Sequence, residues 1–131
     1  IGIGTDIVEK QRVSKAVKNS EYFCRKVYSP KERQLIKERK NPAGLLAMNF
    51  AGKEAVSKAF GTGIRSDIRL CDIEILRDEL GAPYVILHGG AKKYARERGI
   101  EKIHISLSDT REEYAVAYVI AEGKVVGECS T

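Results

Sequence analysis

Residues 50–63, with the sequence FAGKEAVSKAFGTG, are the stretch that decides the fold. They predict the second half of a long helix followed by a glycine-rich exit. Asn41-Pro42 is typical of a helix start, because proline is favoured at the first helical position. Gly61 can adopt the left-handed conformation that ends a helix, so we expect the helix to end at Phe60.

The chemistry of this helix lies on one stripe, because residues four apart on a helix share a face. The stripe contains Leu46, Phe50, Glu54 and Lys58, and it changes from apolar to charged along its length. A stripe that begins in the core and ends in charges indicates the wall of a cleft. The alternative is an ordinary exposed Glu-Lys pair, which stabilises a helix by roughly 0.3 kcal/mol.

The composition describes a globular chain of 131 residues, with 43% hydrophobic and 31% charged residues. We expect one domain over residues 1–122 and a C-terminal tail over residues 123–131. No apolar run reaches the length of a membrane span and no secretory signal is visible, so we expect a cytoplasmic protein. Cys24, Cys71 and Cys129 lack the spacing of zinc ligands, which indicates reduced thiols.

The first residues, IGIGTDIV, alternate as a strand that places Gly2, Gly4 and Asp6 on one face. Glycine weakens a strand, but it allows another element or a ligand to approach the backbone closely. Asp6 could instead open a turn or cap the following helix.

The remaining patterns predict an α+β domain, in which a mostly antiparallel sheet packs against the long helix and short helices are added. The small residues Ala115, Ala117 and Ala121 form one face of the last strand, which suits a helix lying close across it. We expect short helical segments within residues 9–19, 20–29, 30–40 and 91–98, and further strands within residues 68–76, 84–87, 102–108 and 114–121.

Positive charge is concentrated in the first part of the chain. Residues 1–40 contain eleven Lys and Arg against five Asp and Glu, a balance of +6, whereas residues 41–131 have a balance of −1. Arg12, Lys15 and Lys18 recur every three residues of the first expected helix. This face could be a solvated surface, or it could dock an acidic partner, either nucleic acid or protein.

Asp6 and Glu54 lie on different elements, and both have small neighbours in the sequence. If the first strand packs beside the long helix, the two carboxylates can reach one hard cation. One or two carboxylates, with water and substrate phosphates, are a typical Mg²⁺ site. Lys58 would then lie where a phosphate leaving group develops negative charge.

Taken together, IGIGTDIV and FAGKEAVSKAFGTG resemble the 4'-phosphopantetheinyl transferase superfamily, and within it the short holo-acyl carrier protein synthases of bacteria. DIEILRDELGAPYV and the closing ISLSDT and EYAVAYVI segments extend the resemblance over nearly the whole domain. The resemblance implies a Mg²⁺-dependent enzyme of fatty acid biosynthesis. It would transfer the phosphopantetheine arm of coenzyme A to a serine of apo-acyl carrier protein and release adenosine 3',5'-bisphosphate.

The resemblance also implies roles for individual residues and a homotrimer with its sites at subunit interfaces. Asp6 and Glu54 match the metal ligands, and with Lys58 they form the catalytic set. The first helix would dock the acidic carrier through Arg12, Lys15 and Lys18. Contacts to coenzyme A fall on Lys53, Lys58, Gly61, Gly63, Asp109 and Thr110.

Three positions depart from the family pattern. Val8 stands where two-domain relatives have a further acid, Asp109 stands where many short members have His, and Asn49 stands where Arg is frequent. The competing hypothesis is a non-enzymatic basic module that binds RNA or another polyanion through residues 10–40. Because that hypothesis leaves Asp6, Glu54 and Lys58 unexplained, we do not expect a nucleic acid as partner. The lack of an apolar run of membrane-spanning length predicts that a membrane is not a partner either.

Overall fold

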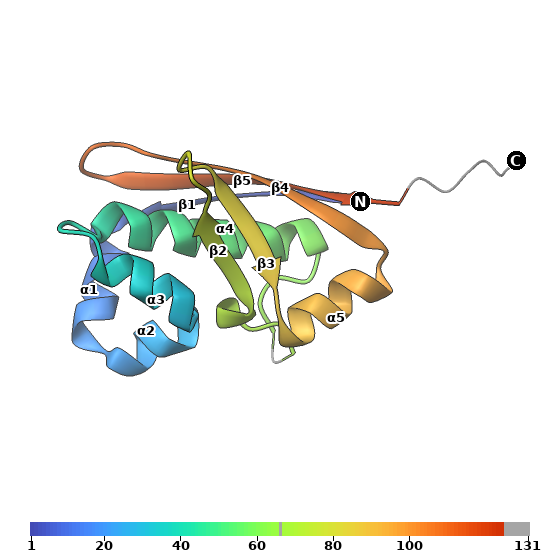
Figure 1. Cartoon of the computed structure of the whole chain (residues 1–131), viewed down its shortest axis with the longest axis horizontal. Helices are drawn as coiled ribbons and strands as arrows, with labels where there is room; N and C mark the ends of the chain where they lie inside the picture. Colours follow the sequence, from blue (N-terminus) through green and yellow to red (C-terminus); the bar gives the residue numbers. More distant parts are fainter. Residues whose placement is uncertain (66, 125–131) are drawn as a thin grey trace, which may run out of the picture.

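A computed structural model describes residues 1–65 and 67–124, and its central element is α4 (Ala43–Phe60). This helix crosses one face of an antiparallel sheet in the order β1 (Gly2–Glu9), β5 (Tyr114–Gly123) and β4 (Ile100–Asp109) (Figure 1). The expected α+β fold, in which an antiparallel sheet packs against a long helix, is confirmed.

Close contact between β1 and α4 explains the glycines at the start of the chain. A Cβ atom at Gly4 would lie 1.9 Å from the carbonyl oxygen of Ala55, and one at Gly2 would lie 2.1 Å from that of Ala59. The backbone of α4 therefore occupies the space where β1 side chains would stand. On β5 the buried face is small as well, with Ala115, Ala117, Val119 and Ala121 turned toward the helix.

The remaining elements surround the two ends of α4. Figure 1 shows the first three helices gathered at one end and the fifth at the other, with a two-stranded antiparallel sheet alongside. The expected strand over residues 68–76 is too long at its start, because residues 70–72 form a 3₁₀ turn closed by the bond from Asp72 N to the Arg69 carbonyl at 3.0 Å. These elements are α1 (Lys10–Asn19), α2 (Glu21–Val27), α3 (Pro30–Lys37), η1 (Leu70–Asp72), β2 (Ile73–Arg77), β3 (Pro83–Leu87) and α5 (Gly89–Glu97).

Two apolar clusters share α4. Its C-terminal half, including Ala55 and Phe60, packs against the three-stranded sheet and α5. Its N-terminal half, including Leu46, packs against Val13 of α1 and Val27 of α2. Side chains on α4 are thus fixed from both sides, which suits the rigid placement of a functional site.

A buried polar network connects α3, α4 and β2. Glu32 is fully buried and accepts hydrogen bonds from Lys53 Nζ at 2.6 Å and from Asn49 Nδ2 at 2.9 Å. Arg77 donates to Asn49 Oδ1 at 2.9 Å. Asn49 is therefore a structural residue of the interior, and its amide has no access to a substrate phosphate.

The last strand extends further than expected, since β5 runs to Gly123 and the predicted tail over residues 123–131 begins inside it. Residues 125–131, with Cys129, lie outside the described residues, whereas Cys24 and Cys71 are both free thiols. In the part of the chain that the structure describes, no helix has the length and apolar character needed to cross a membrane.

Candidate functional site

Asp6, Glu54 and Lys58 come together where β1 passes the C-terminal half of α4. Lys58 Nζ forms an ion pair with Asp6 Oδ1 at 2.9 Å and donates to the Thr5 carbonyl at 3.0 Å. Asp6 does not cap the following helix, because the N-cap residue of α1 is Glu9. The sequence favoured a pairing of Lys58 with Glu54 as the simple alternative, but the close approach of β1 brings the aspartate to the ammonium.

The electrostatics of this cluster favour a cation. The pKa of Glu54 is raised, chiefly because the carboxyl is half-buried and also because the charge of Asp6 lies nearby, while Lys58 acts in the opposite direction. Two carboxylates face one ammonium, so the cluster has a net negative charge that a hard divalent ion would neutralise. Among residues 1–65 and 67–124, no group of three or more His, Cys, Asp or Glu is placed to hold a metal alone. Asp6 and Glu54 therefore fit an ion that keeps water and substrate oxygens as further ligands.

The stripe on α4 follows the predicted gradient from core to surface. Leu46 is buried, Phe50 and Glu54 are partly buried, and Lys58 is exposed. Phe50 stacks on Phe23 of α2, with ring centroids 6.2 Å apart.

The Phe23–Phe50 pair lines a hollow of about 390 Å³ that also contains Arg12 and Val13 of α1. Sequence reasoning did not identify Phe23 as a candidate site residue. Its helix of seven residues is too short for a clear periodic signal.

The expected contact of Lys53 with coenzyme A is wrong. The side chain has an exposed fraction of 0%, and its ammonium donates to Glu32 Oε1 at 2.6 Å and to the carbonyls of Leu70 and Ile73 at 2.9 and 2.5 Å. A lysine has three donors, so all of them are used inside the protein. Burial also lowers the pKa of Lys53, which the neighbouring Glu32 partly offsets.

The glycine exit of α4 is a helix cap. Gly61 and Gly63 have φ angles of 83° and 63°, which only glycine adopts readily. The N–H of Gly61 donates to the Lys58 carbonyl, and those of Thr62 and Gly63 donate to the Ser57 carbonyl, at 2.9, 3.3 and 3.2 Å. These N–H groups are used in the cap, so a phosphate cradle of backbone donors at this loop is not supported. Any contact of the two glycines with coenzyme A must use their open backbone surface.

The loop after this cap is fastened to α5 through Tyr94. The Tyr94 ring lies 5.3 Å from that of Phe60, its hydroxyl donates to the Phe60 carbonyl at 3.1 Å, and Arg65 lies over its face at 5.4 Å. Arg65 also pairs with Asp67 at 2.7 Å. The position of the chain that leaves the site is thereby fixed.

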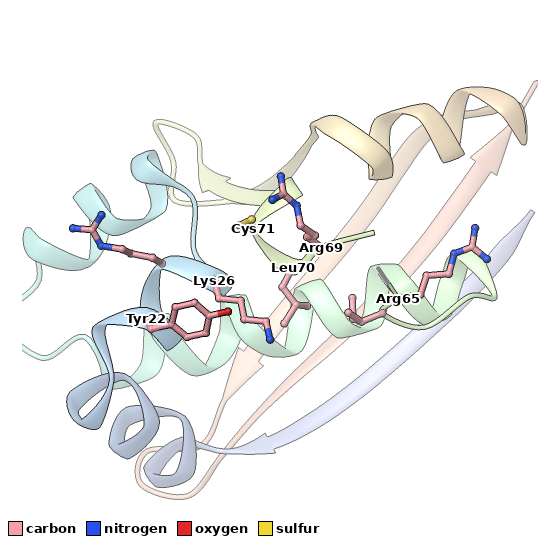
Figure 2. A pocket seen from close by; sticks show the side chains of 8 residues that line it. Tyr22, Lys26, Arg65, Arg69, Leu70 and Cys71 are labelled. Carbon is pink, nitrogen blue, oxygen red and sulfur yellow. The ribbon is translucent and has the colours of Figure 1, made fainter. Parts of the chain in front are cut away.

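A pocket of about 700 Å³ lies between α2 and the segment that follows α4. Figure 2 shows Tyr22 and Lys26 of α2 on one side of it and Leu70 and Arg65 on the other. Its surface is mainly apolar and cations stand among the lining residues. The full lining is Tyr22, Arg25, Lys26, Ile64, Arg65, Arg69, Leu70 and Cys71.

The Asp109-Thr110 turn lies at the opposite end of α4 from the glycine exit. A Cβ atom at Gly44, in the first turn of α4, would lie 2.8 Å from Asp109 Oδ2. At 1.5 Å per residue, the distance along the helix from Gly44 to Gly61 is roughly 25 Å. One chain therefore cannot bring the turn and the glycine exit to the same phosphate.

The three basic residues of the first helix are all exposed on α1. Arg12 lies 3.8 Å from Glu9, in a loose surface contact, and Lys15 and Lys18 point to solvent. This arrangement is compatible with a docking surface, which stays a prediction.

Comparison with known proteins agrees with this geometry. The profile of the 4'-phosphopantetheinyl transferase superfamily matches residues 2–119. A holo-[acyl-carrier-protein] synthase of Serratia proteamaculans is 45% identical over 94% of this chain and 98% of its own length.

Two crystal structures of such synthases are similar as well. The protein from Neisseria meningitidis is 37% identical with a TM-score of 0.84, covering 92% of this chain and 97% of its own. The protein from Bacillus anthracis, in complex with coenzyme A (3',5'-ADP), is 33% identical with a TM-score of 0.79, covering 95% and 97%. The chain belongs to the 4'-phosphopantetheinyl transferase superfamily.

Proposed function

We propose that the protein transfers the 4'-phosphopantetheine group of coenzyme A to a serine of apo-acyl carrier protein, releasing adenosine 3',5'-bisphosphate. The observation that supports this most directly is the convergence of Asp6, Glu54 and Lys58 on one partly buried site. The similar synthase from Bacillus anthracis, in complex with coenzyme A (3',5'-ADP), agrees with this substrate and this product. The reaction would serve fatty acid biosynthesis in the cytoplasm.

In the proposed reaction the serine hydroxyl attacks the phosphorus that bears the pantetheine arm. Glu54 accepts the serine proton, directly or through a water molecule. The new bond joins the serine oxygen to phosphorus, and the bridging oxygen leaves with the adenosine bisphosphate. Lys58, which is held at β1 by Asp6, would stabilise the charge that develops on this leaving oxygen.

Asp6 and Glu54 are the residues that would hold Mg²⁺. The bound ion would supply charge neutralisation for the two coenzyme phosphates. Among residues 1–65 and 67–124, Lys58 is the only cation paired with Asp6. Val8 stands where a third acid would be, and its side chain has no oxygen. Water would therefore complete the ligand set.

We place the pantetheine arm in the pocket of Figure 2. The pocket begins at Ile64, directly after the glycine exit, and its mainly apolar surface suits an uncharged, flexible arm. Replacing Ile64 by Trp would narrow it and should raise the KM for coenzyme A. Replacing the 95% exposed Leu80 by Trp is the matched control, because it adds the same bulk at a residue that does not line this pocket.

The carrier protein would dock on α1. Its exposed basic side chains match an acidic partner, and the hollow beside Arg12, lined by Phe23 and Phe50, could receive an apolar side chain of that partner. Phe50 lies one helical turn before Glu54, so a carrier bound there would have its serine near the proposed base.

A homotrimer with shared sites accounts for two further features. The outer face of the sheet is apolar and uncovered, with Ile3 73% exposed, Ile7 62% and Tyr118 58%. An uncovered apolar face of this kind marks an interaction surface. The Asp109 turn is also remote from Glu54 within one chain, so a second subunit would have to bring its own turn to the coenzyme.

The transfer reaction is tested directly by incubating the protein with apo-acyl carrier protein, coenzyme A and Mg²⁺ and weighing the intact carrier. We expect a mass increase equal to one phosphopantetheine, which is lost in the presence of a chelator. A carrier with its acceptor serine changed to alanine is the control. If the carrier keeps its original mass, the proposal is wrong, and salt-sensitive binding of RNA without coenzyme A would favour the basic module instead.

The shared site is tested by Ile3→Asp, measured by light scattering and by transfer activity. Burying the new charge in a subunit interface is unfavourable, so we expect monomers with little activity. Leu80→Asp carries the same charge outside the sheet face and should stay oligomeric and active. A fully active monomer of the wild-type chain would contradict the shared site.

A further inference from the structure

Lys10 joins three elements that are far apart in the sequence. Its ammonium donates to Asp109 Oδ2 at 2.9 Å and to the carbonyls of Thr110 and Arg111 at 3.0 and 3.1 Å. Its backbone N–H also donates to the Glu113 carbonyl at 2.8 Å. The first residue of α1 is thus bound to the hairpin tip, which we define as residues 109–113, from the last residue of β4 to the residue before β5.

The Lys10–Asp109 ion pair is largely buried, and every donor of the Lys10 ammonium has an acceptor. The side chain of Lys10 is 11% exposed and that of Asp109 is 32% exposed. The three donors of the ammonium have three acceptors, all of them in the hairpin tip. A lysine ammonium is compact and carries three donors, so it fits these three acceptors. The planar guanidinium of arginine does not have the geometry to replace it.

Two residues that are unfavourable for their own helices, Lys10 in α1 and Gly44 in α4, lie at this ion pair. A cation in the first turn of a helix opposes the positive end of the helix dipole, and α1 has neither an acidic residue in its first turn nor a side-chain cap. Glycine weakens the first turn of α4, yet a Cβ atom at Gly44 would lie 2.8 Å from Asp109 Oδ2 and 3.8 Å from Lys10 Nζ. Both residues are explained if the pair itself is needed, and such local conflicts are expected near functional sites.

We propose that Lys10 is a positioning residue, which holds α1 and the hairpin tip in one fixed arrangement and so supports both the carrier-docking surface of its own site and the turn that its subunit offers to the coenzyme of a neighbouring site. This inference rests on the proposed function, in which α1 docks the carrier and the Asp109-Thr110 turn meets the coenzyme. Asp109 then acts on the coenzyme through the position of the tip, which explains how a carboxylate can stand beside a phosphate-binding turn. The Thr110 hydroxyl likewise accepts from the backbone N–H of Glu113 and Tyr114 at 3.1 and 2.8 Å.

The first test needs no substrate. Lys10→Met keeps the length of the side chain and removes the charge and the donors. We expect faster amide hydrogen exchange at Thr110 in the tip, at Tyr114 next to it and in the first turn of α1, with exchange in α5 unchanged. Exchange at wild-type rates in the tip and in α1 would overturn the inference, whatever the reaction proves to be.

The second test separates binding from chemistry. Lys10→Met should raise the KM for the carrier and the KM for coenzyme A by about three- to tenfold each, with kcat nearly unchanged. Lys92→Met, on the exposed surface of α5, is the matched control and should leave both values unchanged. A general loss of stability would lower the active fraction, and hence kcat, and would not raise both KM values.

A double-mutant cycle assigns the effect to the pair. Asp109→Asn alone should raise the same two KM values, and the combination with Lys10→Met should be no worse than Lys10→Met alone. If either KM stays at its wild-type value in the folded Lys10→Met variant, Lys10 does not position both elements. A wild-type protein without any transfer activity would refute the proposed function, and the exchange experiment would still decide the role of Lys10.

Discussion

Gly4→Ala is the sharpest test of how the fold forms the site. The new Cβ atom would lie 1.9 Å from the Ala55 carbonyl oxygen and 2.7 Å from the Ala59 nitrogen. Ordinary contacts begin near 3.4 Å, so β1 and α4 must separate by about 1.5 Å, the difference between the two distances. Both atoms that the methyl group meets belong to the helix backbone, which cannot move aside as a side chain can.

The magnitude follows from this separation. Overpacking against rigid atoms costs up to about 3 kcal/mol, which corresponds to a fall in Tm of roughly 10 °C for a chain of this size. Asp6 lies on the same strand, two residues further on, so it should move away from Glu54. A misplacement of about 1 Å can reduce turnover by roughly 100-fold. We therefore expect transfer activity to fall further than the folded fraction does.

Thermal unfolding by circular dichroism and the mass assay on the folded protein measure these two effects. Gly52→Ala is the matched control, because its Cβ atom would meet only the methyl end of Ile75 at 2.5 Å and those of two other side chains. Its better helix propensity, worth about 1 kcal/mol, should offset most of that crowding. If Gly4→Ala unfolds at the wild-type temperature and keeps full activity, the close contact of β1 with α4 does not position Asp6.

Three further variants, one of them with two substitutions, test separate parts of the structure. Burial raises the pKa of Glu54, so ionisation of its carboxyl destabilises the folded protein. This destabilisation is absent at a pH below the ordinary glutamate pKa and is complete at a pH above the raised pKa of Glu54. Glu54→Gln should therefore raise Tm at neutral pH in metal-free buffer and leave Tm unchanged at acidic pH. The same variant should show no transfer in the mass assay, and near-normal turnover would refute the role of Glu54 as base. Lys53→Met should lower the free energy of unfolding by about 3–5 kcal/mol, because it leaves Glu32 buried without its cation. Denaturant unfolding measures this loss, which should be smaller in the Lys53→Met/Glu32→Gln variant. Charge reversal of Lys15 and Lys18 should raise the KM for the carrier several-fold while the KM for coenzyme A stays constant, and an equal rise in both would argue against α1 as the docking surface.

The sequence predicted the parts of the fold that depend on local pattern. The alternation of glycine with larger residues in β1 and the alanines of β5 indicated a helix lying close to the sheet, and the structure confirms it. The stripe from Leu46 to Lys58 likewise predicted the change from core to surface. Both patterns are repeated over several residues, so single exceptions do not hide them.

The errors arose where a residue's environment comes from a distant segment. The resemblance implied that Lys53 contacts the coenzyme, and nothing in its own helix reveals that its ammonium pairs with Glu32 of α3. The resemblance also implied that Gly61 and Gly63 contact the coenzyme, but their N–H groups donate to the last carbonyls of α4. Asp109 could not be interpreted without Lys10, which is 99 residues away in the chain.

The pairing of β1 with β5 has a consequence for the order in which the protein acquires its site. Asp6 lies opposite Ala117, and in the described part of the chain β1 has no other strand neighbour. During synthesis β1 is made long before β5. The strand that carries Asp6 therefore has no sheet partner until β5 has been made. Pairings between such distant segments are slow to form because a long loop must close first. We therefore expect a nascent chain that stops before β5 to contain Asp6, Glu54 and Lys58 without the sheet that holds β1 in place, so that completion of the sheet precedes formation of the site.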